Sequence, residues 1–187
     1  MNKPTRKRDA EATKADIVHA AKMVFCEKGY DSAGTREIAE RAGVNVALIA
    51  RYFGSKEGLF AVSIPPELTM DFLLEGDMSE YGARVAALFV GKEGHKEFDP
   101  TVALLRAASS PDATKHLRGA LFDQIITPLA NRLVGENRIE RATLVASAVA
   151  GYDLSVRVIG VRATTTDDLE PMRALLAKSI QAHIDNK

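Results

Sequence analysis

The chain has 187 residues, of which 46% are hydrophobic and 27% charged, so it can form one or two globular domains with an ordinary core. Its single cysteine excludes an intrachain disulfide, no apolar run approaches the roughly 20 residues of a membrane span, and the polar N-terminus has no signal-peptide pattern, so we expect a cytoplasmic protein. The net charge is zero, but residues 1–60 carry 11 basic and 8 acidic side chains, which either suits a polyanionic partner or reflects chance.

The first predicted elements are a basic arm and a helix. Residues 1–12 are polar and predict a disordered arm, which either solubilises the chain or reaches DNA phosphates or a minor groove. Thr13 is a suitable N-cap, and apolar residues then recur at three- and four-residue steps from Ile17 to Phe25. Gly29 is placed to end this helix, because glycine readily adopts the left-handed conformation found just after helices.

Two short helices follow, joined by a tight turn. Gly34 can cap the first, predicted over residues 35–42, and Gly43 breaks the chain because glycine tolerates a positive φ. Asn45 then caps the second, predicted over residues 45–53. With the longer helix packed behind them, these elements form a helix-turn-helix arrangement.

The second short helix has more apolar side chains than one small core can cover. Val44, Ile49 and Phe53 can point inward. The outer face then carries small apolar side chains with a leucine at its edge, namely Val46, Ala47, Ala50 and Leu48. Small side chains suit close approach to base edges and thymine methyl groups in a major groove.

Hydrogen-bond donors suited to phosphates surround this face, and they are Arg36, Arg51, Tyr52 and Lys56. Lys56 also begins the next helix, where backbone N–H groups favour an anion. The pattern therefore indicates a DNA-binding surface. The alternative is an apolar patch for a protein partner, on a helical interaction module that does not bind DNA.

Residues 20–60, AAKMVFCEKGYDSAGTREIAERAGVNVALIARYFGSKEGLF, resemble the tetracycline-repressor (TetR) family of bacterial regulators. The matching residues stand at the family's spacing, and they are Gly29-Tyr30, Ile38-Ala39, Ala42-Gly43-Val44, Tyr52-Phe53 and Lys56-Glu57. The resemblance implies that Tyr52 and Lys56 hold phosphates and that Arg36 reaches the backbone or a base. It also implies that five positions of the recognition helix face DNA, namely Asn45, Val46, Ala47, Leu48 and Ala50.

Two positions depart from the family's pattern. Ala33-Gly34 stands where the family usually has a Thr/Ser pair, so a hydroxyl contact to phosphate is missing. Ala50 replaces a larger polar or aromatic residue. We therefore expect readout that depends more on DNA shape and methyl contacts than on hydrogen bonds.

The resemblance also implies an organisation for the whole chain. It predicts an all-α fold with a three-helix DNA-binding domain over residues 13–60 and a larger regulatory and dimerisation domain over residues 61–187. Such a protein would be a homodimeric repressor, released from a palindromic operator by a small-molecule effector. Because catalytic and phosphate-loop motifs are absent and the four histidines are scattered, we expect no enzyme activity, no cofactor and no metal site.

After Phe60 the apolar periodicity, prolines and glycines predict further helices. Their ranges are 67–76, 79–91, 100–109, 110–134 and 139–159, followed by an apolar seam over 169–183. The resemblance makes the last two helices a dimer interface, and the alternative is that both are buried inside one subunit. The interface candidates are Ala142, Val145, Ala146, Val149, Leu169, Met172, Leu176 and Ile180.

The family's ligand pocket is expected between the DNA-binding and dimerising ends of the chain. Its candidate lining residues are Phe72, Leu88, Phe89, Leu104, Leu105, Phe122, Ile125 and Tyr152. Few of them are polar and none carries a fixed charge, which would suit a hydrophobic effector. The alternative is that they are ordinary core residues.

Overall fold

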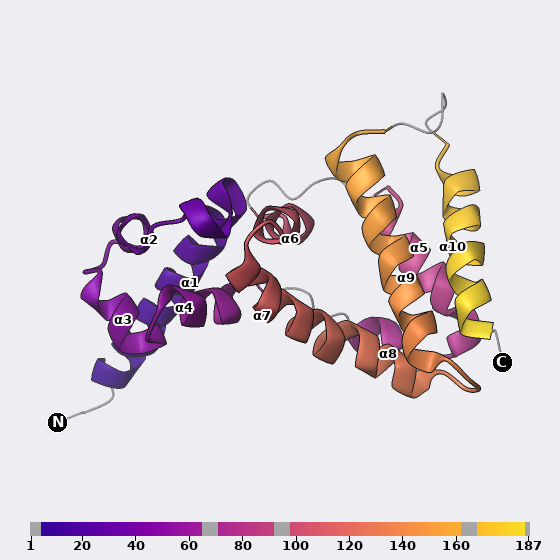
Figure 1. Ribbon diagram of the computed structural model, residues 1–187, viewed down its shortest axis with the longest axis horizontal. Coiled ribbons are helices and arrows are strands. Elements are labelled where there is room, and N and C mark those ends of the chain that lie inside the picture. The colour runs from indigo at the N-terminus through magenta and orange to yellow at the C-terminus, as the bar shows by residue number, and fades with distance from the viewer. Residues whose placement is uncertain (1–4, 65–70, 92–97, 162–167, 186–187) are drawn as a thin grey trace. The chain divides into compact units, whose positions relative to one another are not determined.

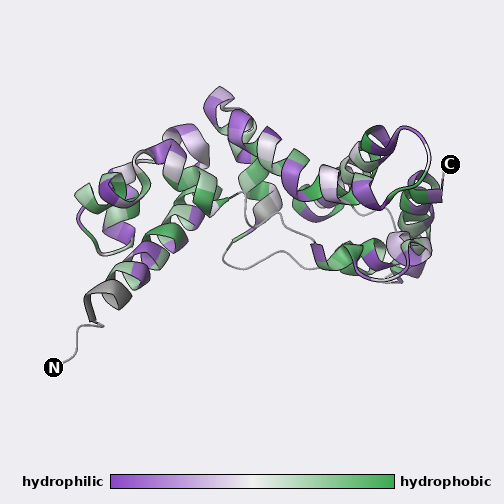
Figure 2. Ribbon diagram, turned by 90° about the horizontal axis from the view of Figure 1, so that it is seen from below, coloured by the Kyte–Doolittle hydropathy of each residue, from purple (hydrophilic) through white to green (hydrophobic). Residues whose placement is uncertain are grey.

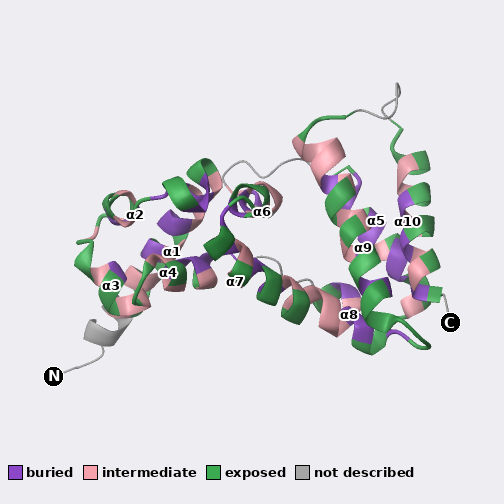
Figure 3. Ribbon diagram, viewed as in Figure 1, coloured by how far each residue is buried: buried purple, intermediate pink, exposed green. Residues whose placement is uncertain are grey.

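The computed structural model describes residues 5–64, 71–91, 98–161 and 168–185, and every regular element in these ranges is a helix (Figure 1). The predicted all-α fold is therefore confirmed. Hydrophilic and hydrophobic residues alternate along the helices (Figure 2), and buried positions alternate with exposed ones in the same way (Figure 3). Each helix thus buries one face, as expected for a soluble helical core. No helix among the described residues is long and apolar enough to cross a membrane.

The chain divides into two compact units. The first comprises residues 1–67 and 96–118, and the second comprises residues 68–95 and 119–187. The unit that contains the helix-turn-helix is therefore larger than the predicted segment 13–60, because a segment from the middle of the chain folds with it.

The first unit begins with α1 (Thr5–Ser32). The sequence predicted a disordered arm over residues 1–12, but the structure continues the helix back to Thr5, and residues 1–4 lie outside the described residues. No glycine or proline separates Thr5 from Ile17, so nothing in the sequence stops the helix earlier. Gly29 interrupts α1 with φ 75° and ψ 173°, which confirms the predicted break.

The other helices of the first unit are α2 (Thr35–Arg41), α3 (Ala47–Phe53), α4 (Lys56–Ser63), α6 (Pro100–Ala107) and the beginning of α7 (Pro111–Leu121). One core joins them, with Phe25 of α1 packed edge to face against Phe60 of α4 at a ring separation of 5.1 Å. Ala103 and Ala107 of α6 are buried in the same core.

The end of α1 is fastened to α6 by a polar contact. Arg106 of α6 donates hydrogen bonds to the carbonyl of Cys26, at 2.8 Å, and to that of Glu27. A Cβ on Gly29 would lie 3.2 Å from the Arg106 carbonyl oxygen, so this close approach favours a glycine as well. These contacts explain why α6 belongs with the helix-turn-helix rather than with the rest of the C-terminal segment.

The second unit is built around α5 (Tyr81–Phe89), α8 (Thr127–Arg132), α9 (Arg138–Tyr152) and α10 (Glu170–Asp185). Two 3₁₀ turns, η2 (Asp71–Leu74) and η3 (Met78–Glu80), precede α5, and two π-helical turns, η4 (Phe122–Ile126) and η5 (Asp153–Val158), extend the longer helices. The predicted helix over 67–76 is a 3₁₀ turn at 71–74, and its residues 67–70 lie outside the described residues. Pro128 accounts for η4, because proline has no N–H to donate to the preceding turn.

Two backbone approaches set the geometry of the second unit. A Cβ on Gly82 would lie 2.3 Å from the carbonyl oxygen of Ala177, so only glycine lets α5 approach α10 this closely. The buried guanidinium of Arg141 donates to the carbonyls of His183 at 2.7 Å and Ile184 at 2.6 Å, which end α10. It also donates to the carbonyls of Val134 and Glu136, so one side chain joins α9, the end of α10 and the loop before α9.

Candidate nucleic-acid interface

The turn between α2 and α3 has the geometry that the sequence predicted. Gly34 is the N-cap residue of α2, and Gly43 adopts φ 67° just after that helix. The Val44 N–H donates to the Ala39 carbonyl at 2.9 Å, which closes the turn. The Asn45 side chain accepts from the Ala47 N–H at 2.9 Å, the predicted capping contact, although α3 begins at Ala47 rather than at Asn45.

The two faces of α3 are divided as predicted. Ile49 is buried, and Val44 and Phe53 are half-buried against the first core. The exposed residues on the other side are Asn45, Val46, Ala47, Ala50 and Arg51, and Leu48 is intermediate. A row of small, exposed side chains therefore lies along one side of a helix that is firmly packed on the other.

Exposed arginines lie on both helices of the motif. Arg36 on α2 is exposed, and Arg51 on α3 is exposed with its guanidinium carbon 5.8 Å from the centre of the Tyr52 ring. Lys14 of α1 also lies over that ring, with its Nζ at 5.6 Å from the centre. Lys14 was not predicted from the sequence, because contact between α1 and α3 leaves no local pattern that marks it.

Two further cations near this face are neutralised by ion pairs. Arg41 pairs with Glu27 at 2.7 Å, and this hydrogen bond lowers the pKa of the Glu27 carboxyl. Lys28 pairs with Glu37, also at 2.7 Å. Both pairs connect α1 to α2, so these residues brace the motif, and Arg41 is engaged by Glu27 although it is exposed like Arg36 and Arg51.

The first turn of α4 makes more hydrogen bonds within the protein than the sequence predicted. Lys56 was expected beside free backbone N–H groups, but the Ser55 hydroxyl accepts from the Gly58 N–H at 3.2 Å and so satisfies one of them. Hydrogen bonds from the Ser55 side chain, from the backbone N–H of Glu57 itself and from the Tyr30 hydroxyl lower the pKa of the Glu57 carboxyl from 4.5 to about 2. Two backbone N–H groups at this helix end, those of Glu57 and Gly58, are therefore already engaged.

The two sequence profiles that match the chain cover both of its parts. The profile described as "Bacterial regulatory proteins, tetR family" matches residues 17–62, which span α2, the turn, α3 and most of α4. The profile described as "Tetracyclin repressor-like, C-terminal domain" matches residues 79–184, more than half of the chain. The chain belongs to the TetR family.

Similar proteins agree with this membership over the full length. The HTH-type transcriptional dual regulator CecR of Shigella flexneri is 28% identical and covers 99% of this chain and 95% of its own. A TetR-family regulator of Streptomyces coelicolor A3 has the same fold with a TM-score of 0.62 and 23% identity, over 100% of this chain and 99% of its own. FadR of Bacillus subtilis, solved in complex with stearoyl-CoA, has a TM-score of 0.65 and 16% identity, over 91% and 97%.

Family membership decides between the two interpretations of the exposed α3 face. This TetR-family protein is a helix-turn-helix, DNA-binding transcriptional regulator, rather than a helical module for protein partners alone. In helix-turn-helix proteins the second helix of the motif lies in the major groove.

Four of the eight predicted dimer residues lie in the chain's own second core. Ala142, Val145, Leu176 and Ile180 are buried in the core of the second unit, so the chain itself already covers them. A three- and four-residue repeat shows that a helix has an apolar face, but it does not show which partner covers that face. Of the eight candidates only Leu169 is exposed, since Ala146, Val149 and Met172 are half-buried.

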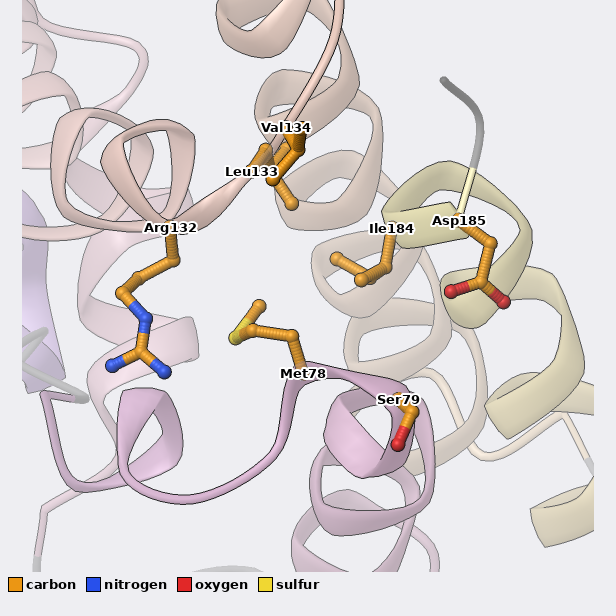
Figure 4. A pocket seen from close by; sticks show the side chains of 7 residues that line it. All are labelled: Met78, Ser79, Arg132, Leu133, Val134, Ile184 and Asp185. Atoms are coloured by element: carbon orange, nitrogen blue, oxygen red, sulfur yellow. The ribbon is translucent and has the colours of Figure 1, made fainter.

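The predicted pocket residues are divided between the two units. Leu104 and Leu105 belong to α6 in the first unit, and the other six lie in the second. Phe89 is core, while Phe72 and Phe122 are exposed. A pocket of about 380 Å³ opens in the second unit, and none of the eight lines it (Figure 4). Its lining residues are Met78, Ser79, Arg132, Leu133, Val134, Ile184 and Asp185.

Proposed function

We propose that this TetR-family regulator is a cytoplasmic repressor that binds a palindromic operator as a homodimer. Each subunit would place α3 in a major groove, and two such helices would read half-sites about one DNA turn apart, about 34–36 Å. The observation that supports this most strongly is the exposed row of small side chains on α3, together with the exposed Arg36 on α2 and Arg51 on α3.

The proposed contacts divide into two classes. Val46, Ala47 and Ala50 would approach base edges and thymine methyl groups, since their short side chains let the helix backbone come close. Asn45 and Leu48 would flank them, although Asn45 already accepts the Ala47 N–H and so has less capacity for a base. The phosphate contacts would come from Arg36, Arg51, Tyr52 and Lys56.

The dimer would form through α9 and α10, but through their outer faces. Leu144 of α9 is 50% exposed and Leu175 of α10 is 66% exposed, which is unusual for leucines in long helices of a folded unit. We expect Leu175→Glu to give a monomer in sedimentation equilibrium. Val134→Glu, at an apolar residue that is 72% exposed outside both helices, is the matched control and should stay dimeric.

An effector would act through the second unit. The support is the fold shared with FadR, whose structure holds stearoyl-CoA. An effector that binds one conformation of the dimer better than the other would shift the separation of the two α3 helices and lower DNA affinity. The protein would act by binding alone, without catalysis.

The phosphate contacts can be tested by titrating a mixed-sequence duplex at several salt concentrations. The double variant Tyr52→Phe with Lys56→Ala should weaken binding to every DNA alike and reduce the slope of log affinity against log salt by about one unit for each phosphate that the variant no longer neutralises. Arg138→Ala, which removes an exposed cation at the start of α9, is the control and should change neither quantity. Affinity within about twofold of the wild type would show that the assigned phosphate roles are wrong.

A further inference from the structure

Lys56, in the first turn of α4, contacts Tyr30 and Asp31 at the end of α1. A phosphate role for Lys56 does not by itself account for these contacts. We propose that Tyr30, a core residue that would not touch DNA, is a positioning residue for Lys56 and holds its ammonium ready for a backbone phosphate. This inference rests on the phosphate role proposed for Lys56.

The ammonium of Lys56 has two partners in the free protein. Its Nζ lies 4.4 Å from the centre of the Tyr30 ring, which is within the range of a cation–π interaction. It also donates a hydrogen bond to the carbonyl of Asp31 at 3.3 Å. An ammonium has three donors, so two remain for phosphate oxygens. These contacts therefore orient the lysine and leave two of its N–H donors available to a phosphate.

The ring that carries this contact is itself fixed. Tyr30 is only 3% exposed, and its ring lies 5.9 Å from that of Phe25 and 5.1 Å from that of Phe60. Its hydroxyl donates to the Glu57 carboxylate at 2.9 Å. Because two core rings and a hydrogen bond hold the Tyr30 ring in place, it is a rigid surface against which the flexible Lys56 side chain can be fixed.

The same hydroxyl restrains the carboxylate next to Lys56 in the chain. Glu57 stays ionised at neutral pH and attracts the Lys56 ammonium. The hydrogen bond from Tyr30 holds this carboxylate against α1, where it also accepts from the Ser55 side chain. With these partners, Glu57 has less capacity to pair with Lys56 in place of a phosphate.

The expected gain comes from fixing the side chain before DNA arrives. A free lysine loses rotamer freedom when it binds a phosphate, and a pre-positioned one has already lost it on folding. We expect the platform to strengthen DNA binding by about three- to tenfold, which is the size of the cost of immobilising one rotamer-rich side chain at an interface.

A double-mutant cycle on a mixed-sequence duplex tests this. Tyr30→Leu, Lys56→Ala and the double variant are compared with the wild type for affinity and for salt slope. We expect Tyr30→Leu to lower affinity about three- to tenfold when Lys56 is present and by less than about twofold when it is alanine. Tyr30→Phe keeps the ring and should recover most of the loss. An equal effect of Tyr30→Leu in both backgrounds would mean that Tyr30 serves only the core.

The cycle also separates this inference from the function on which it rests. If Lys56→Ala changes neither affinity nor salt slope, the phosphate role of Lys56 is wrong, and the positioning role fails with it. If Lys56→Ala lowers both while the two substitutions are additive, only the positioning role fails.

Because Tyr30→Leu removes a core ring, a second measurement uses the wild-type protein. The methylene protons next to Nζ of Lys56 should show an upfield ring-current shift in NMR spectra of the free protein and keep it in the DNA complex. Ordinary lysine shifts in the free protein, or disappearance of the upfield shift on DNA binding, would overturn the proposal.

Discussion

The junction between α3 and α4 leads to a prediction about Gly58. This residue lies in the first turn of α4, and a Cβ built on it would be 2.1 Å from the carbonyl oxygen of Phe53, at the end of α3. Its own φ is not in the left-handed region, so alanine would be acceptable to the backbone. The methyl group of alanine would, however, overlap the Phe53 carbonyl oxygen.

The structure sets the size of the effect of Gly58→Ala. Because real Cβ contacts essentially never fall below 3.0 Å, α3 and α4 must separate locally by about 1 Å, and overpacking of this kind costs about 1–3 kcal/mol. Because the obstructing atom is backbone and cannot swing aside, the cost lies in the upper part of this range, and the better helix propensity of alanine offsets at most about 1 kcal/mol of it. We therefore expect a net loss of about 1–2 kcal/mol, which is about 4–16 °C in the melting temperature of a unit this small.

The assay is thermal unfolding combined with DNA titration, because a shifted α3 should also bind less well. Gly119→Ala is the matched control: Gly119 lies in α7 with nothing within 4 Å of its built Cβ, and there alanine should stabilise by about 0.4–1 kcal/mol. A Gly58→Ala protein that melts with the wild type and binds DNA equally well would refute the reasoning from the backbone contact.

Three further predictions concern other contacts. Arg141→Met should leave buried carbonyls without a donor and destabilise the protein by about 2–4 kcal/mol in chemical denaturation, and Arg141→Lys should not rescue it, since an ammonium cannot reach four carbonyls. The Glu57 carboxyl has a pKa lowered to about 2, so its stabilising contribution is complete above its ordinary pKa of 4.5 and is lost as the pH falls toward 2. The difference in melting temperature between the wild type and Glu57→Gln should therefore shrink between pH 6 and pH 2.5. The change should be modest because the carboxyl is exposed. Ala50→Asn should change the preferred operator in a selection experiment, and an unchanged preference would mean that Ala50 does not face a base.

The DNA-binding face could be predicted from the sequence because its determinants are local. The apolar period of α3, together with Gly43 and Asn45, was enough to separate the buried Ile49 from the exposed Ala47 and Ala50. These features depend on helix geometry and turn chemistry within about 20 residues of chain. The burial of Ile49 and the exposure of Ala47 and Ala50 were therefore predicted correctly.

Features that depend on distant partners could not be predicted in this way. Ala103 and Ala107 mark a buried face on α6, but nothing in their spacing says that α1 covers it. The repeat through Leu176 and Ile180 is equally regular whether a second subunit or the chain's own core lies opposite. In the sequence Tyr30 is only one of the residues at the family's spacing, and its place beneath Lys56 is visible only in the folded chain.

The measurement that tests the central claim most directly is selection of bound sequences from random duplex DNA with the purified protein at physiological salt. We predict an enriched palindrome whose half-sites are centred about one helical turn apart, with binding that weakens as salt is raised. No enrichment, together with binding that salt does not weaken, would contradict the assignment of the exposed α3 face to DNA.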